Sequence, residues 1–195
     1  PIRDKETIDI ELQLKDLDTV TKRIDKSKKA AKAGNKEEQK VVEVLTAVTT
    51  HLEELKNVRE MDLDEKELEI VDTLQLITSK PVLYLCNVDE AAAKNGNEWV
   101  DKVKEAVKDE QAEVLILAAQ IEADINELET YEERQVFLEE LGLEEPGVNR
   151  LIRSAYTLLD LETYFTAGVK EVRAWTIKKG STGPQAASVI HTDFE

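Results

Sequence analysis

Apolar residues recur at helical spacing through the first third of the chain. From Ile8 to about Ala33 a strongly charged segment carries a seven-residue apolar repeat at Ile10, Leu14, Leu17 and Ile24, with Thr21 and Lys28 as weaker members. Residues 33–35 (Ala-Gly-Asn) predict a turn. The next helix has apolar residues spaced four, three, four and three apart: Val41, Leu45, Val48, Leu52 and Leu55. This pattern predicts an antiparallel helical hairpin of the coiled-coil type that projects as an arm; the alternative is two helices packed on a globular core.

Two apolar runs without alternation predict strands in the middle of the chain. Residues 82–86 (Val-Leu-Tyr-Leu-Cys) follow a proline, and residues 114–117 (Val-Leu-Ile-Leu) form the second run. Such runs are typical of strands that are buried on both faces of a parallel sheet. Residues 99–107 between them predict an amphipathic helix, so the three segments together predict a parallel strand–helix–strand unit.

Further helices are predicted on both sides of this unit. One helix is capped by Asp62 or Asp64 and is expected to continue to about Ser79. Another is expected to run without interruption over residues 121–141. The sequence therefore predicts that helices flank the parallel strands, as in α/β proteins.

The last part of the chain changes character. Gly142 is expected to end one helix and Pro146 to begin the next. Residues 163–177 are rich in aromatic and β-branched residues around an Ala-Gly turn and predict a β-hairpin, and a short helix follows at Pro184. A hairpin followed by a helix opens a small β-grasp module, whose later strands the chain lacks.

Composition and charge narrow the possible functions. The 195 residues are 41% hydrophobic and 35% charged, with few glycines and prolines, which favours a helix-rich protein with a real core. The net charge of −16 argues against general affinity for nucleic acids or anionic membranes, and no DNA specificity is expected. No apolar run reaches membrane-spanning length and no signal-peptide pattern opens the chain. The single cysteine, Cys86, fits a reducing compartment, and a cytoplasmic location is expected.

Positive charge is concentrated at the predicted turn of the arm. Between Lys22 and Lys40 eight basic residues stand against three acidic ones, a local charge of +5 in an acidic chain. Basic residues at the tip of an arm suit an RNA backbone or an acidic protein, and the alternative is a solvated helix end. The predicted partner-binding residues are Lys22, Arg23, Lys26, Lys28, Lys29, Lys32 and Lys36.

Polar residues follow the first predicted strand, where open α/β sheets bind ligands. In guanine-binding GTPases such a strand ends in Asn-Lys-x-Asp, and the aspartate accepts two hydrogen bonds from guanine. Here the sequence keeps Asn87 but has Val88 in place of lysine and Glu90 in place of aspartate. The longer carboxylate does not fit the same two-bond position, and losing such a pairing lowers discrimination by several kcal/mol. The pattern therefore predicts a base site that tolerates or prefers adenine.

The second predicted strand ends in small residues followed by an amide. Ala118, Ala119 and Gln120 occupy the place where such folds set a loop whose backbone N–H groups touch the base. A close-packed turn is the simpler explanation of the two alanines. These three residues complete the predicted base-binding set together with Asn87, Val88 and Glu90.

Several longer stretches resemble the YchF-type Obg-like ATPases, a family of translation-factor-like P-loop proteins. The resemblance spans nearly the whole chain, and its C-terminal run is the most specific. It rests on Pro1-Ile2-Arg3-Asp4 with Glu6-Thr7-Ile8, Asp16-Leu17-Asp18-Thr19, Asn87-Val88-Asp89-Glu90, Leu141-Gly142-Leu143-Glu144-Glu145-Pro146-Gly147, residues 163–177, Pro184-Gln185-Ala186-Ala187 and residues 190–195.

The resemblance implies a domain plan and a function. Residues 1–7 and 60–160 would form part of a nucleotide-binding (G-type) domain, residues 8–59 an inserted helical hairpin, and residues 161–195 an incomplete TGS domain. It implies a protein that binds ATP, with GTP as a second candidate nucleotide, and that associates with ribosomes. Asn87 and Glu90 would belong to the altered base-specificity motif of the family.

The chain also departs from the family in one respect. No Gly-x-x-x-x-Gly-Lys-Ser/Thr sequence is present to cradle phosphates, and the switch segments that hold magnesium and the attacking water are missing. The chain is expected to be a piece of a longer protein and inactive by itself, with no catalytic residues, and magnesium is expected only in the longer parent. Whether it is an enzyme therefore stays open.

Other chemistry has weaker support. His51 and His191 lack partners at metal-ligand spacing, so no metal site is predicted. Arg173 and Trp175 could stack on RNA, although core packing of Trp175 is favoured. Besides the ATPase portion, two alternatives remain: a non-enzymatic module that binds RNA, ribosomes or protein through the basic hairpin, and a segment with a structural role alone.

Overall fold

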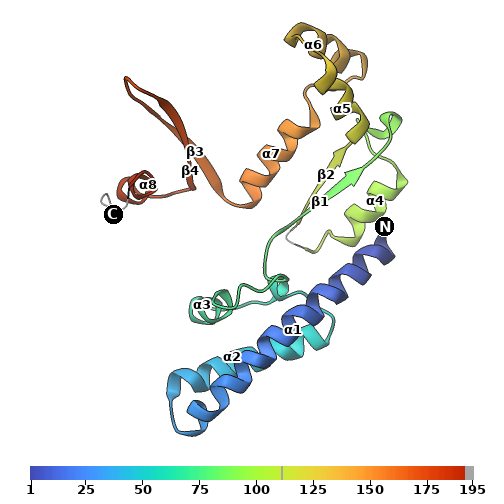
Figure 1. The fold of residues 1–195 in the computed structure, drawn as a ribbon. Helices are drawn as coiled ribbons and strands as arrows, with labels where there is room; N and C mark the ends of the chain where they lie inside the picture. Colours follow the sequence, from blue (N-terminus) through green and yellow to red (C-terminus); the bar gives the residue numbers. More distant parts are fainter. Residues whose placement is uncertain (111, 192–195) are drawn as a thin grey trace. The chain divides into compact units, whose positions relative to one another are not determined.

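The computed structural model of the chain describes residues 1–110 and 112–191 (Figure 1). The final residues of the predicted TGS segment, 192–195, lie outside the described residues. Contacts divide the chain into two compact units. The first comprises residues 1–81 and 102–110, and the second comprises residues 82–101 and 112–191.

A helical hairpin dominates the first unit. Helix α1 (Ile2–Lys32) and helix α2 (Lys36–Glu53) run side by side in opposite directions (Figure 1). The predicted turn is confirmed: Gly34 adopts φ +95°, and the Asn35 side chain caps α2 by accepting the N–H of Glu37 at 3.0 Å. Because α1 begins at Ile2, the first helix starts six residues earlier than predicted.

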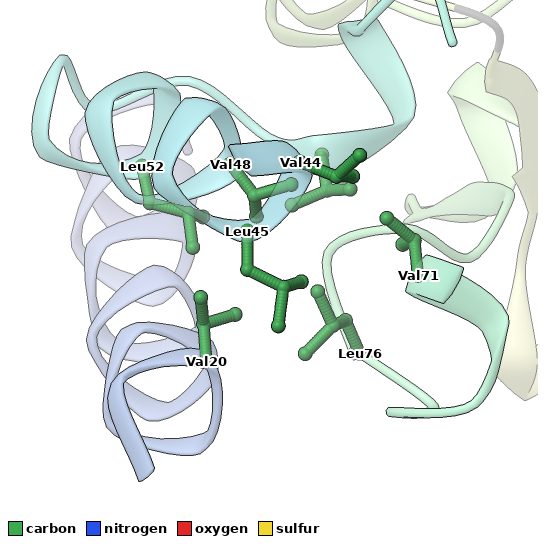
Figure 2. Close-up of a cluster of buried hydrophobic side chains, with 8 residues drawn as sticks. Val20, Val44, Leu45, Val48, Leu52, Val71 and Leu76 are labelled. Atoms are coloured by element: carbon green, nitrogen blue, oxygen red, sulfur yellow. The ribbon is translucent and has the colours of Figure 1, made fainter. Parts of the chain in front are cut away.

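A buried apolar cluster holds this hairpin to the segment that follows it. Figure 2 shows Val20 of α1, Leu45 of α2 and Leu76 pointing toward one another. Val71 of helix α3 (Glu65–Asp72) joins them, and Val58 of the short helix η1 (Val58–Glu60) completes the contact. Burying an aliphatic side chain of this size contributes about 1.5–3 kcal/mol, so this cluster stabilises the packing of the hairpin on the segment that follows it.

The apolar stripe predicted for α1 is half wrong. Leu17 and Ile24 pack against the cluster as predicted, but Ile10 is 38% and Leu14 is 59% exposed. The buried positions of α1 are instead Gln13, Asp16, Val20 and Ser27. Three of these four residues are polar, so a search for apolar spacing selects a stripe that is displaced around the helix.

Hydrogen bonds explain how polar residues occupy the buried face. Asp16 accepts the N–H of Ile77 at 2.9 Å and, through Oδ2, both the N–H and the hydroxyl of Thr78 at 2.7 Å. Gln13 Nε2 donates to Asn57 Oδ1 at 3.0 Å. A buried polar group is tolerated when its hydrogen bonds are satisfied, so these contacts fix α1 against residues 57–78.

The end of α2 places Leu55 in an unusual position. The N–H of Leu55 donates to Leu52 O and the N–H of Lys56 donates to His51 O, the two bonds of a Schellman motif. Leu55 has φ +59°, a conformation that usually selects glycine and costs other residues about 1–2 kcal/mol. It was predicted to join the apolar stripe of α2 but is 60% exposed.

Helix α3 is shorter than the sequence predicts. Asp64 caps it by accepting the N–H of Glu67 at 2.9 Å, as one of the two predicted caps. The helix ends at Asp72 rather than near Ser79, because Gln75 takes φ +49° and the backbone beyond it bonds to α1. The prediction that the helix extends to the strand is therefore wrong.

The second unit contains the predicted parallel pair of strands. Strand β1 (Val82–Asn87) pairs in parallel with β2 (Ala112–Leu117), from Val82 beside Ala112 to Asn87 beside Leu117. Helix α4 (Glu98–Ala106) lies between the two strands in sequence. The strand–helix–strand order and the parallel pairing are therefore confirmed.

The strands are less buried than expected. Within the part of the chain that the structure describes, the sheet has two strands, and the second edge of β1 carries no strand. Leu115 and Leu117 of β2 are buried, but no side chain of β1 is, and Leu85 is 47% exposed. The prediction that both faces of β1 are buried is wrong for this reason.

Two helices replace the single one predicted over residues 121–141. Helix α5 (Ala119–Glu127) ends before Leu128, and Thr130 caps helix α6 (Tyr131–Glu140) by accepting the N–H of Glu133 at 3.2 Å. Gly142, with φ +65°, ends α6 as predicted. Ile121, Ile125 and Leu138 of the two helices form a small core with Ala93 and Ala118.

The last elements agree with the sequence prediction. Helix α7 (Gly147–Leu158) begins after Pro146 and packs on β2. Strands β3 (Leu161–Ala167) and β4 (Val172–Lys178) form the expected antiparallel hairpin, and helix α8 (Gly183–Ser188) follows. The completion of this module as a β-grasp fold stays a prediction.

Trp175 is half-buried on the β3–β4 hairpin and does not offer both ring faces. Its Nε1–H donates to Thr166 Oγ1 at 2.9 Å, and the Arg173 guanidinium lies 4.1 Å from the ring centre. Arg173 therefore occupies one face of the ring that a base would need for stacking.

Candidate functional site

The carboxyl ends of β1 and β2 are joined by a side-chain hydrogen bond. Asn87 is the last residue of β1, and its Oδ1 accepts the N–H of Ala119 at 3.0 Å. Ala119 is the first residue of α5 and follows β2 by a single residue. The bond therefore links two loops that lie 32 residues apart in sequence.

Local sequence explains why this bond is needed. A helix leaves its first N–H groups without intrahelical partners, and they require acceptors. Ala118 is the residue before α5, and its methyl side chain has no acceptor to offer. The Asn87 amide supplies one from the neighbouring strand, so it acts as a remote cap for α5. Ala118 is buried and Ala119 is hydrogen-bonded, so the two alanines also fit the simpler explanation of a close-packed turn.

Glu90 lies shortly after the carboxyl end of β1, and its side chain is exposed. It opens the short helix η2 (Glu90–Ala92), whose cap is Asp89: its Oδ1 accepts the N–H of Ala92 at 3.1 Å. The Glu90 carboxylate is exposed and has no hydrogen bond or ion pair within the described residues. Its oxygens are available to accept hydrogen bonds from an outside donor.

The remaining predicted base-site residues are placed differently. Val88 is half-buried: its N–H donates to Leu117 O at 2.9 Å, and its side chain packs against the core that contains Ile121. Gln120 is exposed, and its amide donates to Asp124 at 2.8 Å. The structure therefore brings Asn87, Val88, Ala118 and Ala119 together, with Glu90 and Gln120 exposed at the margin.

One positioning residue near this edge has no local sequence signal. Glu122 of α5 accepts the N–H of Gly147 at 2.6 Å and the N–H of Val148 at 3.2 Å, which caps α7. Gly147 is needed because an added Cβ would lie 2.7 Å from the Glu122 carboxylate and 3.0 Å from Leu117. Only the fold brings these residues together, since 25 positions separate Glu122 from Gly147.

The carboxyl ends of β1 and β2 carry polar groups that could bind a ligand. An exposed carboxylate beside an amide-bridged pair of loops can accept hydrogen bonds from the amino group of a planar base. No group of three or more His, Cys, Asp or Glu residues is placed to hold a metal ion in the described ranges. Among the helices that the structure describes, none is both long and apolar enough to cross a membrane.

Some of the basic residues predicted to bind a partner are engaged inside the arm. Arg23 is half-buried and donates to Ser27 and to both carboxylate oxygens of Glu38, at 3.2 and 3.3 Å. Side-chain hydrogen bonds to the Glu38 carboxylate, first from Ser27 and then from Arg23, hold the pKa of Glu38 below its usual value. Lys22 pairs with Asp18 at 2.6 Å and Lys28 with Asp25 at 2.8 Å.

The other four lysines of that set are exposed around the turn of the arm. They make no salt bridge within the part of the chain that the structure describes, and they are Lys26, Lys29, Lys32 and Lys36. We call these four residues the basic tip. Their charges are available to an anionic partner.

Comparison with known proteins covers the entire chain. Residues 161–195 match the family model for the C-terminal region of YchF GTPases, described as a protein of unknown function (DUF933). The ribosome-binding ATPase YchF of Bacillus subtilis is 48% identical over 197 residues, covering 100% of this chain and 54% of that protein. Obg-like ATPase 1 of Gallus gallus is 39% identical over 201 residues, covering 100% of this chain and 50% of that protein.

A solved structure gives the same correspondence. The Schizosaccharomyces pombe YchF GTPase superposes with a TM-score of 0.88 at 33% identity, covering 100% of this chain and 53% of that one. The chain thus spans about half the length of the curated relatives it matches.

Proposed function

Because the chain belongs to the YchF-type Obg-like ATPase family, we propose that its β1 and β2 ends form the base-recognition half of a nucleotide site that accepts ATP. The proposed contacts come from backbone and side chains of Asn87, Val88, Glu90, Ala118, Ala119 and Gln120. The proposed domain plan assigns residues 1–7 and 60–160 to the nucleotide-binding domain, 8–59 to the inserted arm and 161–195 to a TGS domain.

The hydrogen bond between Asn87 and Ala119 supports this proposal most strongly. It holds the loop after β1 at a fixed distance from the start of α5, and a planar base needs both loops at once. The residues at this edge come from two neighbouring parallel strands, the position where α/β sheets bind ligands.

Glu90 determines the proposed choice of base. Its side chain is one methylene longer than the aspartate that holds guanine in related GTPases, so the two-bond pairing with guanine is not reproduced. Val88 packs into the protein core and offers no aliphatic stem to cover a base. ATP is therefore the proposed ligand, and GTP is proposed to bind more weakly.

Phosphate binding and hydrolysis are proposed to require residues that these 195 do not include. The sequence has no Gly-x-x-x-x-Gly-Lys-Ser/Thr loop, whose backbone and lysine supply much of a nucleotide's affinity in P-loop proteins. In the longer parent, magnesium would be held by that loop and the switch segments. The chain alone is proposed to bind ATP with a dissociation constant on the order of 1 mM.

Amide chemical shifts can detect binding this weak. We expect ATP titrated into the labelled chain to shift the amide signals of Val88, Ala119 and Gln120. Asn87→Ala should abolish these shifts because it removes the acceptor for the Ala119 N–H. Asn126→Ala, an exposed amide on α5, is the matched control and should leave them unchanged. ATP-induced shifts that are the same in Asn87→Ala as in the unmodified chain would refute the proposed base site.

The names of the relatives also support a ribosomal partner. Several are called ribosome-binding ATPases, and we propose that the longer parent of this chain associates with ribosomes in the cytoplasm. A second candidate function, independent of nucleotide, is binding of ribosomal RNA through the basic tip. The observation that favours it is the absence of intramolecular ion pairs at these four lysines in the described part of the chain.

Charge reversal separates the arm from the rest of the surface. The variant Lys29→Glu/Lys32→Glu/Lys36→Glu should weaken binding to a ribosomal RNA hairpin at least tenfold. It should also reduce the slope of log K against log salt concentration by the equivalent of about three phosphate contacts. Lys15→Glu/Lys66→Glu/Lys104→Glu changes the net charge equally at sites outside the basic tip and should have a smaller effect. Equal losses in both variants would rule out a specific role for the tip.

A further inference from the structure

A cavity of about 410 Å³ lies at the base of the helical hairpin, within the first unit. It is lined by the first turns of α1, by the segment after α2 and by Glu110. We call it the basal groove. No residue of the proposed nucleotide site or of the basic tip lines it.

Apolar side chains that the core does not use line this groove. Ile10 is 38% exposed and Leu55 is 60% exposed, and both contribute to the lining. Leu14, one helical turn after Ile10, extends the apolar surface of α1 and is 59% exposed. Leu55 has a left-handed backbone conformation and is not part of the cluster that stabilises the hairpin.

The charges of the groove are unevenly balanced. Lys5 binds Asp9 and Glu110, each at 2.7 Å, and Arg59 also contacts Glu110 at 3.1 Å. These cations neutralise two carboxylates. Glu6 and Glu60 line the same groove and make no ion pair within residues 1–110 and 112–191.

This combination selects the class of partner. Two unneutralised carboxylates repel a phosphate backbone and attract ammonium or guanidinium groups. The apolar residues between them suit an aliphatic side chain, which a simple inorganic cation does not have. The described acidic residues are also not arranged to hold a metal ion.

We propose that the basal groove docks a short basic segment of a partner protein. The segment carries an aliphatic side chain that contacts Ile10 and Leu55, flanked by arginine or lysine residues that pair with Glu6 and Glu60. The arm then has two distinct interaction surfaces of opposite sign. This proposal goes beyond the nucleotide site and does not depend on it.

A peptide of alternating arginine and leucine, eight residues long and fluorescently labelled, is the probe. Fluorescence anisotropy with the 195-residue chain should show saturable binding. A matched arginine–serine peptide, which keeps the charge and loses the aliphatic groups, should bind at least fivefold more weakly. An equal affinity for the two peptides would mean attraction to the acidic chain as a whole and would overturn the proposal.

Variants of the chain locate the binding. Glu6→Gln/Glu60→Gln should weaken binding of the arginine–leucine peptide about fivefold, whereas Glu139→Gln/Glu140→Gln, which removes the same charge from α6, should not. Leu55→Asn should have a similar effect and retain the melting temperature, because asparagine tolerates the left-handed backbone. Val136→Asn, another exposed apolar position, is its control.

Two outcomes contradict the proposal at this stage. Control variants that weaken binding as much as the groove variants would place the peptide elsewhere. Direct binding of a fluorescently labelled short single-stranded RNA to the chain that Leu55→Asn weakens would show that the groove binds an anionic partner and not a basic protein segment.

Discussion

Asp16 is a fully buried carboxylate whose partners are three hydrogen-bond donors on residues 77 and 78. No lysine or arginine pairs with it within the described residues, so two backbone N–H groups and the Thr78 hydroxyl compensate for the cost of burying this carboxylate. These bonds connect α1 to the segment that leads into β1. The Asp16 side chain thus attaches the helix to its neighbours through hydrogen bonds, a role that apolar contacts usually have in a helical hairpin.

Asp16→Asn should lower the free energy of unfolding by about 3 kcal/mol. The amide keeps one acceptor but turns an N–H₂ group toward backbone donors, leaving buried groups unpaired. Urea denaturation of the chain measures the change. Asp18→Asn, two residues along on the exposed face, should leave the urea midpoint unchanged. Equal midpoints for the two variants would show that the buried bonds contribute little.

The place of Asn87 at the end of a strand could be predicted from the sequence, and the burial of Asp16 could not. An asparagine that ends an unalternated apolar run has a recognisable place at the end of a strand. Asp16 lies within a charged helix, and its donors are 61 and 62 residues away. Only the folded chain shows that this carboxylate is buried.

At the scale of elements, the strands and the turns were predicted well because their signals are local. Apolar runs, Gly34 and Gly142 mark strand and helix ends without reference to the rest of the chain. The interruption between α5 and α6 was missed although Thr130 and Glu133 have the Thr-x-x-Glu spacing of a capping box, which marks the start of a helix. The burial of β1 was overestimated because burial depends on neighbouring strands.

The displaced stripe of α1 gives a direct test at this scale. Val20→Ala should reduce the free energy of unfolding by about 2 kcal/mol, because Val20 is fully buried between α2 and Leu76. Leu14→Ala should change it by less than about 0.5 kcal/mol, because Leu14 is 59% exposed. Chemical denaturation of both variants checks this. A larger loss of stability in Leu14→Ala than in Val20→Ala would mean that the buried stripe is the one that apolar spacing alone predicts.

The contact between the two arm helices should depend on acidity. Bonds from Ser27 and Arg23 lower the folded-state pKa of Glu38 below its ordinary value of 4.5. The stabilisation is therefore complete above about pH 4.5 and is lost as the pH falls through the lowered value. As the pH is lowered from 7 to 3, the melting temperature should fall more steeply in the unmodified chain than in Glu38→Gln. Parallel curves would contradict this role, and Glu53→Gln serves as the control.

At the scale of the whole molecule, charge is segregated along the sequence. The chain has a net charge of −16, yet eight of its basic residues fall between Lys22 and Lys40. The basic tip and the acidic basal groove both belong to the first unit. The residues of the proposed nucleotide site lie in the second unit and line neither of these two surfaces.

The central claim is that Glu90 and the Asn87 bridge form a base site that prefers adenine. The ratio of the GTP and ATP dissociation constants tests it most directly, because the two ligands share a triphosphate and differ only in the base. We predict that the chain binds ATP at least about fivefold more tightly than GTP, and that Glu90→Asp raises the affinity for GTP. Equal affinities, or a ratio that Glu90→Asp leaves unchanged, would contradict the account.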